Sequence, residues 1–153
     1  MLPKKFFVTS GAALSKVSVL NSFDKALKEA GIHQYNIVLV SSIIPEGAEE
    51  IEPVKLPIGS IVFCVMARED GVGGETISAG LAYAWDKSRR YGIIAEEHMK
   101  AGDGGIRQSL RDKIREMAEI RDMDIMEPKL VVRSLDIPDG HYGTVVVAAV
   151  FVL

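Results

Sequence analysis

The segment from Thr76 to Trp85 constrains the fold more than any other stretch of the chain, because its side chains alternate in size. The odd positions carry Ile77, Ala79, Leu81, Tyr83 and Trp85, and the even positions carry Thr76, Ser78, Gly80, Ala82 and Ala84. Side chains alternate between two faces along a strand, so the pattern predicts a strand with one face of small residues only. Such a face lets a second sheet approach more closely than the usual ~10 Å, or lets another subunit pack flat against it.

The apolar pattern elsewhere predicts two helices and a majority of strands. A first helix is expected behind an Asn21 or Ser22 cap, with apolar residues from Phe23 to Ala30 and a stop at Gly31. The second carries a narrow apolar stripe from Ile106 to Met117. Strands are expected at residues 6–8, 16–20, 35–40, 59–67, 92–98, 129–135 and 144–152, the first two around a turn at Ser10-Gly11. This order indicates an α+β fold built in layers rather than a Rossmann fold.

Length and composition predict one soluble domain over residues 1–153 and narrow the choice of partners. The net charge of −3 speaks against nucleic acid or an anionic membrane as the main partner. The longest apolar run, Val145 to Leu153, is about half of the ~20 residues that a membrane-spanning helix requires. Cys64 is the only cysteine, which fits a reducing cytoplasm, and its apolar neighbours predict a buried structural thiol. The three histidines lie far apart, so no metal site is expected.

Two adjacent serines, Ser41 and Ser42, follow the apolar run from Tyr35 to Val40. Most serine pairs in this position are simply the polar end of a strand. The pair can also react with its own backbone, since the Ser42 hydroxyl is placed to attack the Ser41 carbonyl and convert the amide into an ester. Elimination at Ser42 and hydrolysis would then cut the chain and leave a pyruvoyl group, a reactive ketone, at the new amino terminus.

A pair of carboxylates, Glu96 and Glu97, ends the apolar run that begins at Gly92. A carboxyl group at such a boundary is partly desolvated, which raises its pKa and suits it to donate a proton. Only one of the two can face a given site, because neighbours on a strand point to opposite faces. The simpler interpretation is two solvated carboxylates at a strand end.

An ordered set of short motifs resembles the pyruvoyl-dependent arginine decarboxylases, a family of small archaeal and bacterial enzymes. The matching motifs span roughly residues 15 to 120. They are Leu20-Asn21-Ser22-Phe23-Asp24, Ala30-Gly31-Ile32, Asn36, Ser41-Ser42-Ile43-Ile44-Pro45, Lys55-Leu56-Pro57-Ile58-Gly59, Gly74-Glu75-Thr76-Ile77-Ser78-Ala79, Gly92-Ile93-Ile94-Ala95-Glu96 and Arg115-Glu116-Met117-Ala118.

The resemblance implies that the chain cuts itself between Ser41 and Ser42. The products would be a β chain, residues 1–41, and an α chain, residues 42–153, that begins with a pyruvoyl group derived from Ser42. This covalent cofactor would serve as the electron sink for converting L-arginine to agmatine and carbon dioxide. The family fold is a four-layer α/β/β/α sandwich, assembled as a trimer of αβ protomers with active sites between neighbours. The small-residue face of 76–84 suits closely packed inner sheets.

The resemblance also assigns roles to three further residues. Glu96 matches the proposed proton donor, and the adjacent Glu97 departs from the family pattern. Asn36 matches a residue that positions the pyruvoyl group and can polarise the scissile carbonyl. Asp24 matches the carboxylate that pairs with the substrate guanidinium. An acid in the first turn of a helix would also be explained by the helix dipole alone.

Three alternatives remain open on the sequence. A related pyruvoyl enzyme could act on another amino acid, such as histidine or aspartate. A homologue that never cuts itself could serve as an oligomeric binding module. A hydrolase could use Ser41 or Ser42 as a simple nucleophile, in which case the chain would stay intact.

Overall fold

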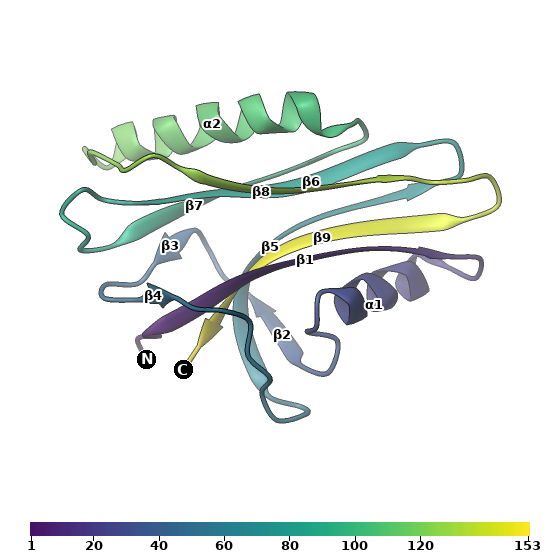
Figure 1. Ribbon diagram of the computed structural model, residues 1–153, viewed down its shortest axis with the longest axis horizontal. Helices are drawn as coiled ribbons and strands as arrows, with labels where there is room; N and C mark the ends of the chain where they lie inside the picture. The colour runs from purple at the N-terminus through teal and green to yellow at the C-terminus, as the bar shows by residue number, and fades with distance from the viewer.

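The computed structural model describes residues 1–153 and confirms an α+β fold with two helices, one mixed sheet and one antiparallel sheet (Figure 1). The helices are α1 (Val19–Glu29) and α2 (Asp103–Ile120). The strands are β1 (Lys5–Ser15), β2 (Asn36–Leu39), β3 (Ile43–Ile44), β4 (Glu49–Glu50), β5 (Ile61–Val72), β6 (Thr76–Trp85), β7 (Gly92–Met99), β8 (Lys129–Asp136) and β9 (Tyr142–Val152). Neither helix is long and apolar enough to cross a membrane.

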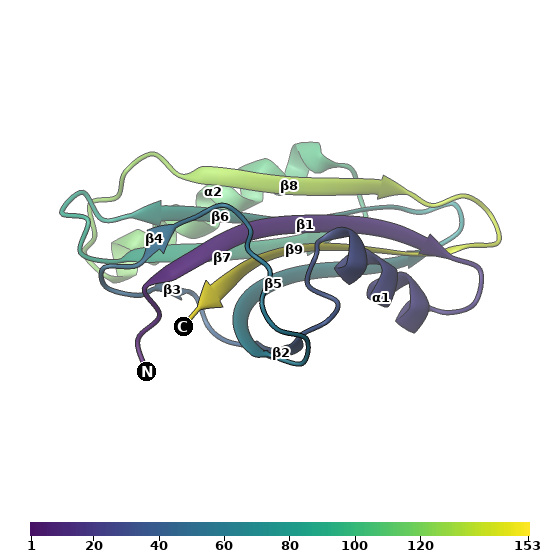
Figure 2. The ribbon, with the colours of Figure 1, turned by 60° about the horizontal axis from the view of Figure 1, so that its bottom comes forward.

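The strands form a five-stranded sheet in the order β2-β5-β9-β1-β4 and a four-stranded sheet in the order β3-β7-β6-β8. The pairs β1–β4 and β2–β5 are parallel, and all other pairs are antiparallel. Strands β1 and β9 pair along eleven residues, so the first and last strands of the chain lie side by side. Figure 2 shows β5 bending strongly at its start, where β2 pairs with it.

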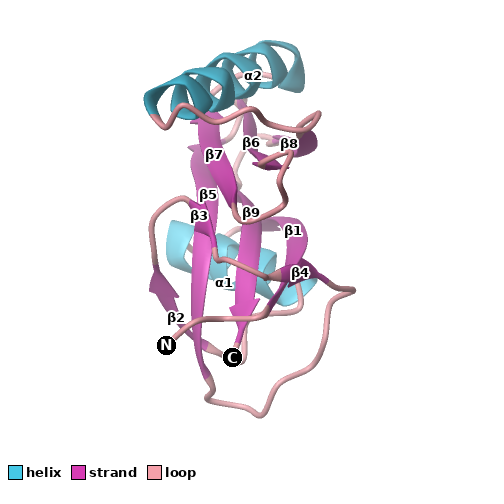
Figure 3. Ribbon diagram, turned by 90° about the vertical axis from the view of Figure 1, so that its left-hand side faces the viewer, coloured by secondary structure: helices cyan, strands magenta, loops and turns pink.

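Three apolar clusters hold the layers together, and each lies on a different face. The first lies between the two sheets and joins residues of β5 and β9, such as Val65 and Val147, to Leu81 of β6. The second lies between α1 and the five-stranded sheet, and the third lies between α2 and the four-stranded sheet. Figure 3 shows α2 above the strands β7, β6 and β8, with β5, β9 and β1 below them.

The strand predicted from Thr76 to Trp85 is confirmed as β6, but the prediction for its small face is wrong. The large odd-numbered residues, among them Leu81 and Tyr83, face the other sheet. Ala82 and Ala84 lie in the cluster under α2. A Cβ atom on Gly80 would lie 3.0 Å from Leu110 Cδ1, so the small residues make room for a helix rather than for a second sheet.

The beginning of the chain also differs from the prediction, because β1 is one continuous strand and residues 16–20 form no strand. Gly11 is not a turn: a Cβ atom there would lie 2.0 Å from the Ala26 carbonyl oxygen, so the glycine lets α1 pack closely on β1. The cap of α1 is Ser18, whose hydroxyl accepts a hydrogen bond from the Asn21 amide. Ser22 is buried inside the helix against Thr144.

Strand β2, which the apolar run of residues 35–40 predicted, lies at the edge of its sheet and is largely exposed in the single chain. Val38 and Val40 are about two-fifths exposed, and Leu39 is 65% exposed. Ile61 at the start of the neighbouring strand is exposed as well. The serine pair therefore follows an apolar edge that the chain itself does not cover.

Candidate active site

Ser41 and Ser42 lie where the chain passes from one sheet to the other. Before the serine pair, the Val40 amide donates to the Cys64 carbonyl oxygen at 3.0 Å, which continues the pairing of β2 with β5. At the second serine, the Ile94 amide donates to the Ser42 carbonyl oxygen at 2.8 Å, which begins the pairing of β3 with β7. The peptide bond between the two serines is therefore the link between two independently anchored segments.

The segment after Ser42 is held tightly. Ile43 and Ile44 pair with Ile93 and Gly92, and the Ile44 side chain is completely buried. A Cβ atom on Gly92 would lie 2.7 Å from the Ala84 carbonyl oxygen and 2.9 Å from Ile44 Cδ1, so only glycine allows this close approach. These contacts fix residue 42 by its carboxyl side, and they do not depend on the bond to Ser41.

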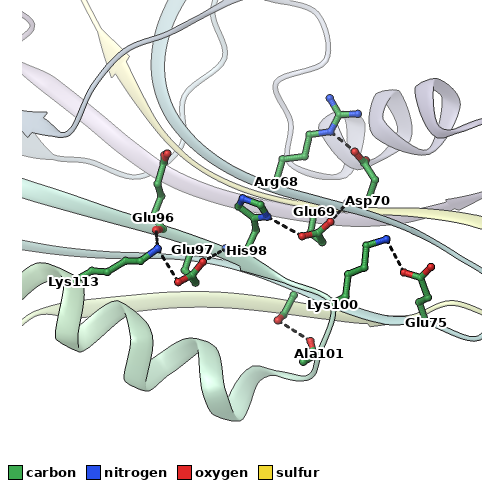
Figure 4. A network of polar contacts seen from close by, with 11 residues as sticks. Arg68, Glu69, Asp70, Glu75, Glu96, Glu97, His98, Lys100, Ala101 and Lys113 are labelled. Carbon is green, nitrogen blue, oxygen red and sulfur yellow. Dashed lines mark hydrogen bonds and ion pairs between the residues drawn. The ribbon is translucent and has the colours of Figure 1, made fainter.

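Glu96 lies two residues beyond Ile94 on β7. The Ile94 side chain is buried between the two sheets, and the Glu96 side chain points away from α2 (Figure 4). Partial burial raises the pKa of Glu96, and the positive charges of His98 and Lys113 oppose that rise without cancelling it. This is the direction predicted for an acid at the end of an apolar run. The buried Cys64 thiol feels the same carboxylate: burial and then the charge of Glu96 raise its pKa to about 12. The thiol is therefore inert, as its neighbours predicted.

Glu97 points to the opposite face and serves to tie α2 to β7. Its Oε2 accepts from Lys113 Nζ at 2.7 Å and from the Ser109 hydroxyl. Burial alone would raise the pKa of Glu97, but these bonds and the His98 amide outweigh it and lower the pKa. Lys113 also donates to the Glu96 carbonyl oxygen at 3.1 Å. Glu97 is thus bound to the helix, and Glu96 is the carboxyl group on the face of β7 that α2 does not cover (Figure 4).

Asn36 lies at the other end of β2 from the serine pair. It is exposed, and its Nδ2 donates to the Gly59 carbonyl oxygen at 3.0 Å. Five residues of extended strand separate Asn36 from Ser41, which is about 16 Å at ~3.3 Å per residue. A single chain does not bring Asn36 to its own serine pair.

Asp24 is exposed in the middle of α1, beyond its first turn, which contains no acid. The helix dipole therefore does not explain this residue, because its effect falls off within the first turn. Beside it, Phe23 lines a groove of about 380 Å³ between α1 and the strands β2 and β5, with Arg68 Cζ 3.6 Å from the centre of the Phe23 ring. The other lining residues are Leu27, Tyr35, Ile37, Leu39, Met66 and Arg68.

His98 was not predicted as a site residue, and the structure places it on the Glu96 face of β7. Its Nδ1 lies 2.7 Å from Glu69 Oε2 on β5, across the gap between the sheets (Figure 4). The alternation of a strand already puts residues 96 and 98 on one face. The partner on β5 could not be found from the sequence, because it depends on how the two sheets stack.

Comparison with known proteins finds one family that matches almost the full length of the chain. A family model described as pyruvoyl-dependent arginine decarboxylase (PvlArgDC) matches residues 5–153. A protein of Methanopyrus kandleri named pyruvoyl-dependent arginine decarboxylase is 33% identical over 150 residues, which cover 98% of this chain and 97% of that protein. Pyruvoyl-dependent arginine decarboxylase 2 of Archaeoglobus fulgidus is 34% identical over 160 residues, covering 100% and 99%. Pyruvoyl-dependent arginine decarboxylase 1 of Methanosarcina mazei is 35% identical over 173 residues, covering 100% and 98%. The chain belongs to the pyruvoyl-dependent arginine decarboxylase family.

Proposed function

We propose that the chain cuts itself between Ser41 and Ser42 and then decarboxylates L-arginine to agmatine and carbon dioxide. The observation that carries this proposal is the anchoring of residue 42. Its carbonyl oxygen accepts a hydrogen bond from the Ile94 amide, and Glu96 lies two residues beyond Ile94 on β7. A reactive group at position 42 would keep its place beside an acid after the chain is cut.

The cut itself needs only the two serines and water. The Ser42 hydroxyl oxygen attacks the Ser41 carbonyl carbon, and the C–N bond breaks, which leaves an ester and a free amine. Elimination of the Ser41 carboxylate from the Ser42 Cβ gives an enamine, which rearranges to an imine. Water then hydrolyses the imine to a ketone and releases ammonia. Because segments 36–40 and 43–44 are paired to different sheets, both new ends stay anchored.

In turnover, a pyruvoyl group at residue 42 would supply the electron sink for loss of carbon dioxide. Glu96 would hold the proton that the substrate α-carbon takes up when carbon dioxide has left. Its raised pKa suits this role, because more of the carboxyl group is protonated near neutral pH than in an ordinary glutamate. Neighbouring apolar residues, Ile94 and Ile44, exclude water on the interior side.

Arginine recognition is assigned to Asp24, and positioning of the group at residue 42 to Asn36. Neither contacts the serine pair of its own chain, so the proposal requires a neighbouring chain. The exposed apolar edge at Val38, Leu39 and Ile61 supports such a neighbour, because association would remove these side chains from water. We infer a trimer of αβ protomers, with each site built between two of them, in the cytoplasm.

We infer four layers for the fold. The contacts of α1 with the five-stranded sheet, of α2 with the four-stranded sheet, and of the sheets with each other support a four-layer α/β/β/α sandwich.

Incubation of purified protein with a panel of amino acids tests the proposed function. We expect two polypeptides on denaturing electrophoresis and release of carbon dioxide from arginine but not from histidine or aspartate. Ser42→Ala should stay uncut and inactive. An uncut parent would favour a binding homologue, and an uncut chain labelled by serine-directed acylating agents would favour a hydrolase. Carbon dioxide from histidine or aspartate instead would keep the chemistry and change the substrate.

A further inference from the structure

The row of side chains that β7 presents to the five-stranded sheet continues beyond Glu96. His98 follows on the same face and is bound to Glu69 of β5, and Lys100, just after β7, is bound to Glu75 in the β5–β6 turn. His98 Nδ1 lies 2.7 Å from Glu69 Oε2, and Lys100 Nζ lies 2.9 Å from Glu75 Oε2 (Figure 4). Residues 96 and 98 are about 7 Å apart along the strand.

We propose that His98 is a positioning residue for the proton donor: Glu69 clamps its ring across the two sheets, and the ring holds a positive charge beside Glu96. The inference rests on the proposed function, in which Glu96 donates the proton. The contact with Glu69 holds the exposed His98 ring in one position. The His98 side chain is 60% exposed and could turn into solvent, whereas Glu69 is 15% exposed and held in the sheet.

The clamp also fixes which ring nitrogen is free. Glu69 as a carboxylate can only accept, so Nδ1 carries the hydrogen of the shared bond. Nε2 is then the nitrogen that remains for solvent or for a group in the site.

The other charged groups around this row are few and are mostly paired. On β5, Arg68 and Asp70 are paired at 3.1 Å on the opposite face, toward α1. On β8, Arg133 is in register with His98 through Ala79 and is paired with Glu29. On α2, Lys113 lies at the Glu96 carbonyl oxygen and at Glu97. On β6, the residues opposite 96, 97 and 98 are uncharged: Leu81, Gly80 and Ala79. His98 is therefore the cation on the same face nearest to Glu96 along β7.

The consequence is a lower affinity of Glu96 for its proton than burial alone would give. His98 and Lys113 are the two charges that lower the pKa of Glu96 against the effect of burial. The positive charge of His98 thus limits the rise in the pKa of Glu96, so that the carboxyl group releases its proton more readily than burial alone would allow. Removing the charge should make Glu96 a weaker acid.

A carboxyl-carbon NMR titration of glutamate-labelled protein tests this without requiring turnover. The Ser42→Ala background keeps the chain uncut, and Glu96→Gln identifies the Glu96 signal by its loss. We expect His98→Gln to move the Glu96 midpoint upward by about 0.4 pH unit, for a charge about 7 Å away in a medium close to water. His98→Lys keeps a positive charge and should move the midpoint back toward the parent value.

Two controls separate this effect from general ones. His141→Gln removes a histidine in the β8–β9 turn, whose ring contacts the Asp139 carbonyl oxygen, and should leave the midpoint unchanged. Glu69→Ala releases the His98 ring into solvent and should move the midpoint upward, but less than His98→Gln. In the cut enzyme, the alkaline limb of the kcat profile should move to higher pH in His98→Gln.

A Glu96 midpoint that stays at the parent value in His98→Gln would overturn the inference. The outcome is independent of the proposed function, since the titration is made on uncut protein. A parent that neither cuts itself nor decarboxylates arginine would overturn the proposed function while the electrostatic link between His98 and Glu96 could still be measured.

Discussion

At the scale of single residues, the site depends on the alternation of side chains along β7. The Glu96 side chain points away from α2, whereas Glu97 binds Ser109 and Lys113 of α2 (Figure 4). The sequence predicted a carboxyl group with a raised pKa and indicated that only one of Glu96 and Glu97 could face the site. It could not decide between them, because the answer depends on which face α2 covers.

The two carboxylates give a matched pair of substitutions. Glu96→Gln should still cut itself but lose decarboxylation by about 100-fold or more, because the amide has no proton to donate. Glu97→Gln should keep kcat within a few fold. Product formation measured on the separated, cut enzymes checks both, and equal losses in the two variants would contradict the assignment.

Glu97 should contribute instead to stability, in a pH-dependent way. Its pKa is lowered from the ordinary 4.5 in the folded state, so the contribution is present above about pH 4.5 and is lost as the pH falls through the folded-state pKa. Glu97→Gln should lower the free energy of unfolding at neutral pH by about 1 kcal/mol and flatten its decline below pH 4.5. Urea unfolding at several pH values measures this, and an unchanged decline would count against the tie to α2.

At the scale of elements, local patterns predicted most helices and strands but not what covers them. Strand β6 and helix α2 were evident from periodicities of two and 3.6. The start of α1 was missed because Ser18 and Ser22 are both good caps locally. Only the bond from Ser22 to Thr144 of β9 shows that Ser22 belongs inside. Likewise, the small face of β6 could receive a sheet or a helix, and the sequence alone cannot tell which.

Gly11 tests the packing of α1 on β1. Gly11→Ala should lower the free energy of unfolding by about 1–3 kcal/mol or more, because the new methyl group would lie 2.0 Å from the Ala26 carbonyl oxygen. Gly104→Ala is the matched control. Nothing lies within 4 Å of that position in α2, and alanine favours a helix, so this variant should be as stable as the parent or up to about 1 kcal/mol more stable. Thermal and denaturant unfolding compare the two variants, and equal stability would contradict the close contact.

At the scale of the whole molecule, the proposed cut divides the chain without dividing the fold. Residues 1–41 would keep β1, α1 and β2, and β1 pairs along its whole length with β9 of the other piece. Phe6 and Phe7 are buried in the clusters on the two faces of the sheet. The two pieces should therefore remain one particle until they are denatured.

Size-exclusion chromatography with light scattering checks this expectation. The cut protein should elute as one species containing both polypeptides, with the mass of three αβ protomers, and should separate only in denaturant. Release of the 1–41 piece under native conditions would contradict the account of how the sheet holds it.

The intact mass of the purified protein tests the central claim most directly. The uncut chain has a mass of 16.7 kDa. The account predicts two polypeptides, residues 1–41 and 42–153, with the larger one lighter by one ammonia than the product of simple hydrolysis. A single species at the uncut mass after prolonged incubation would contradict it.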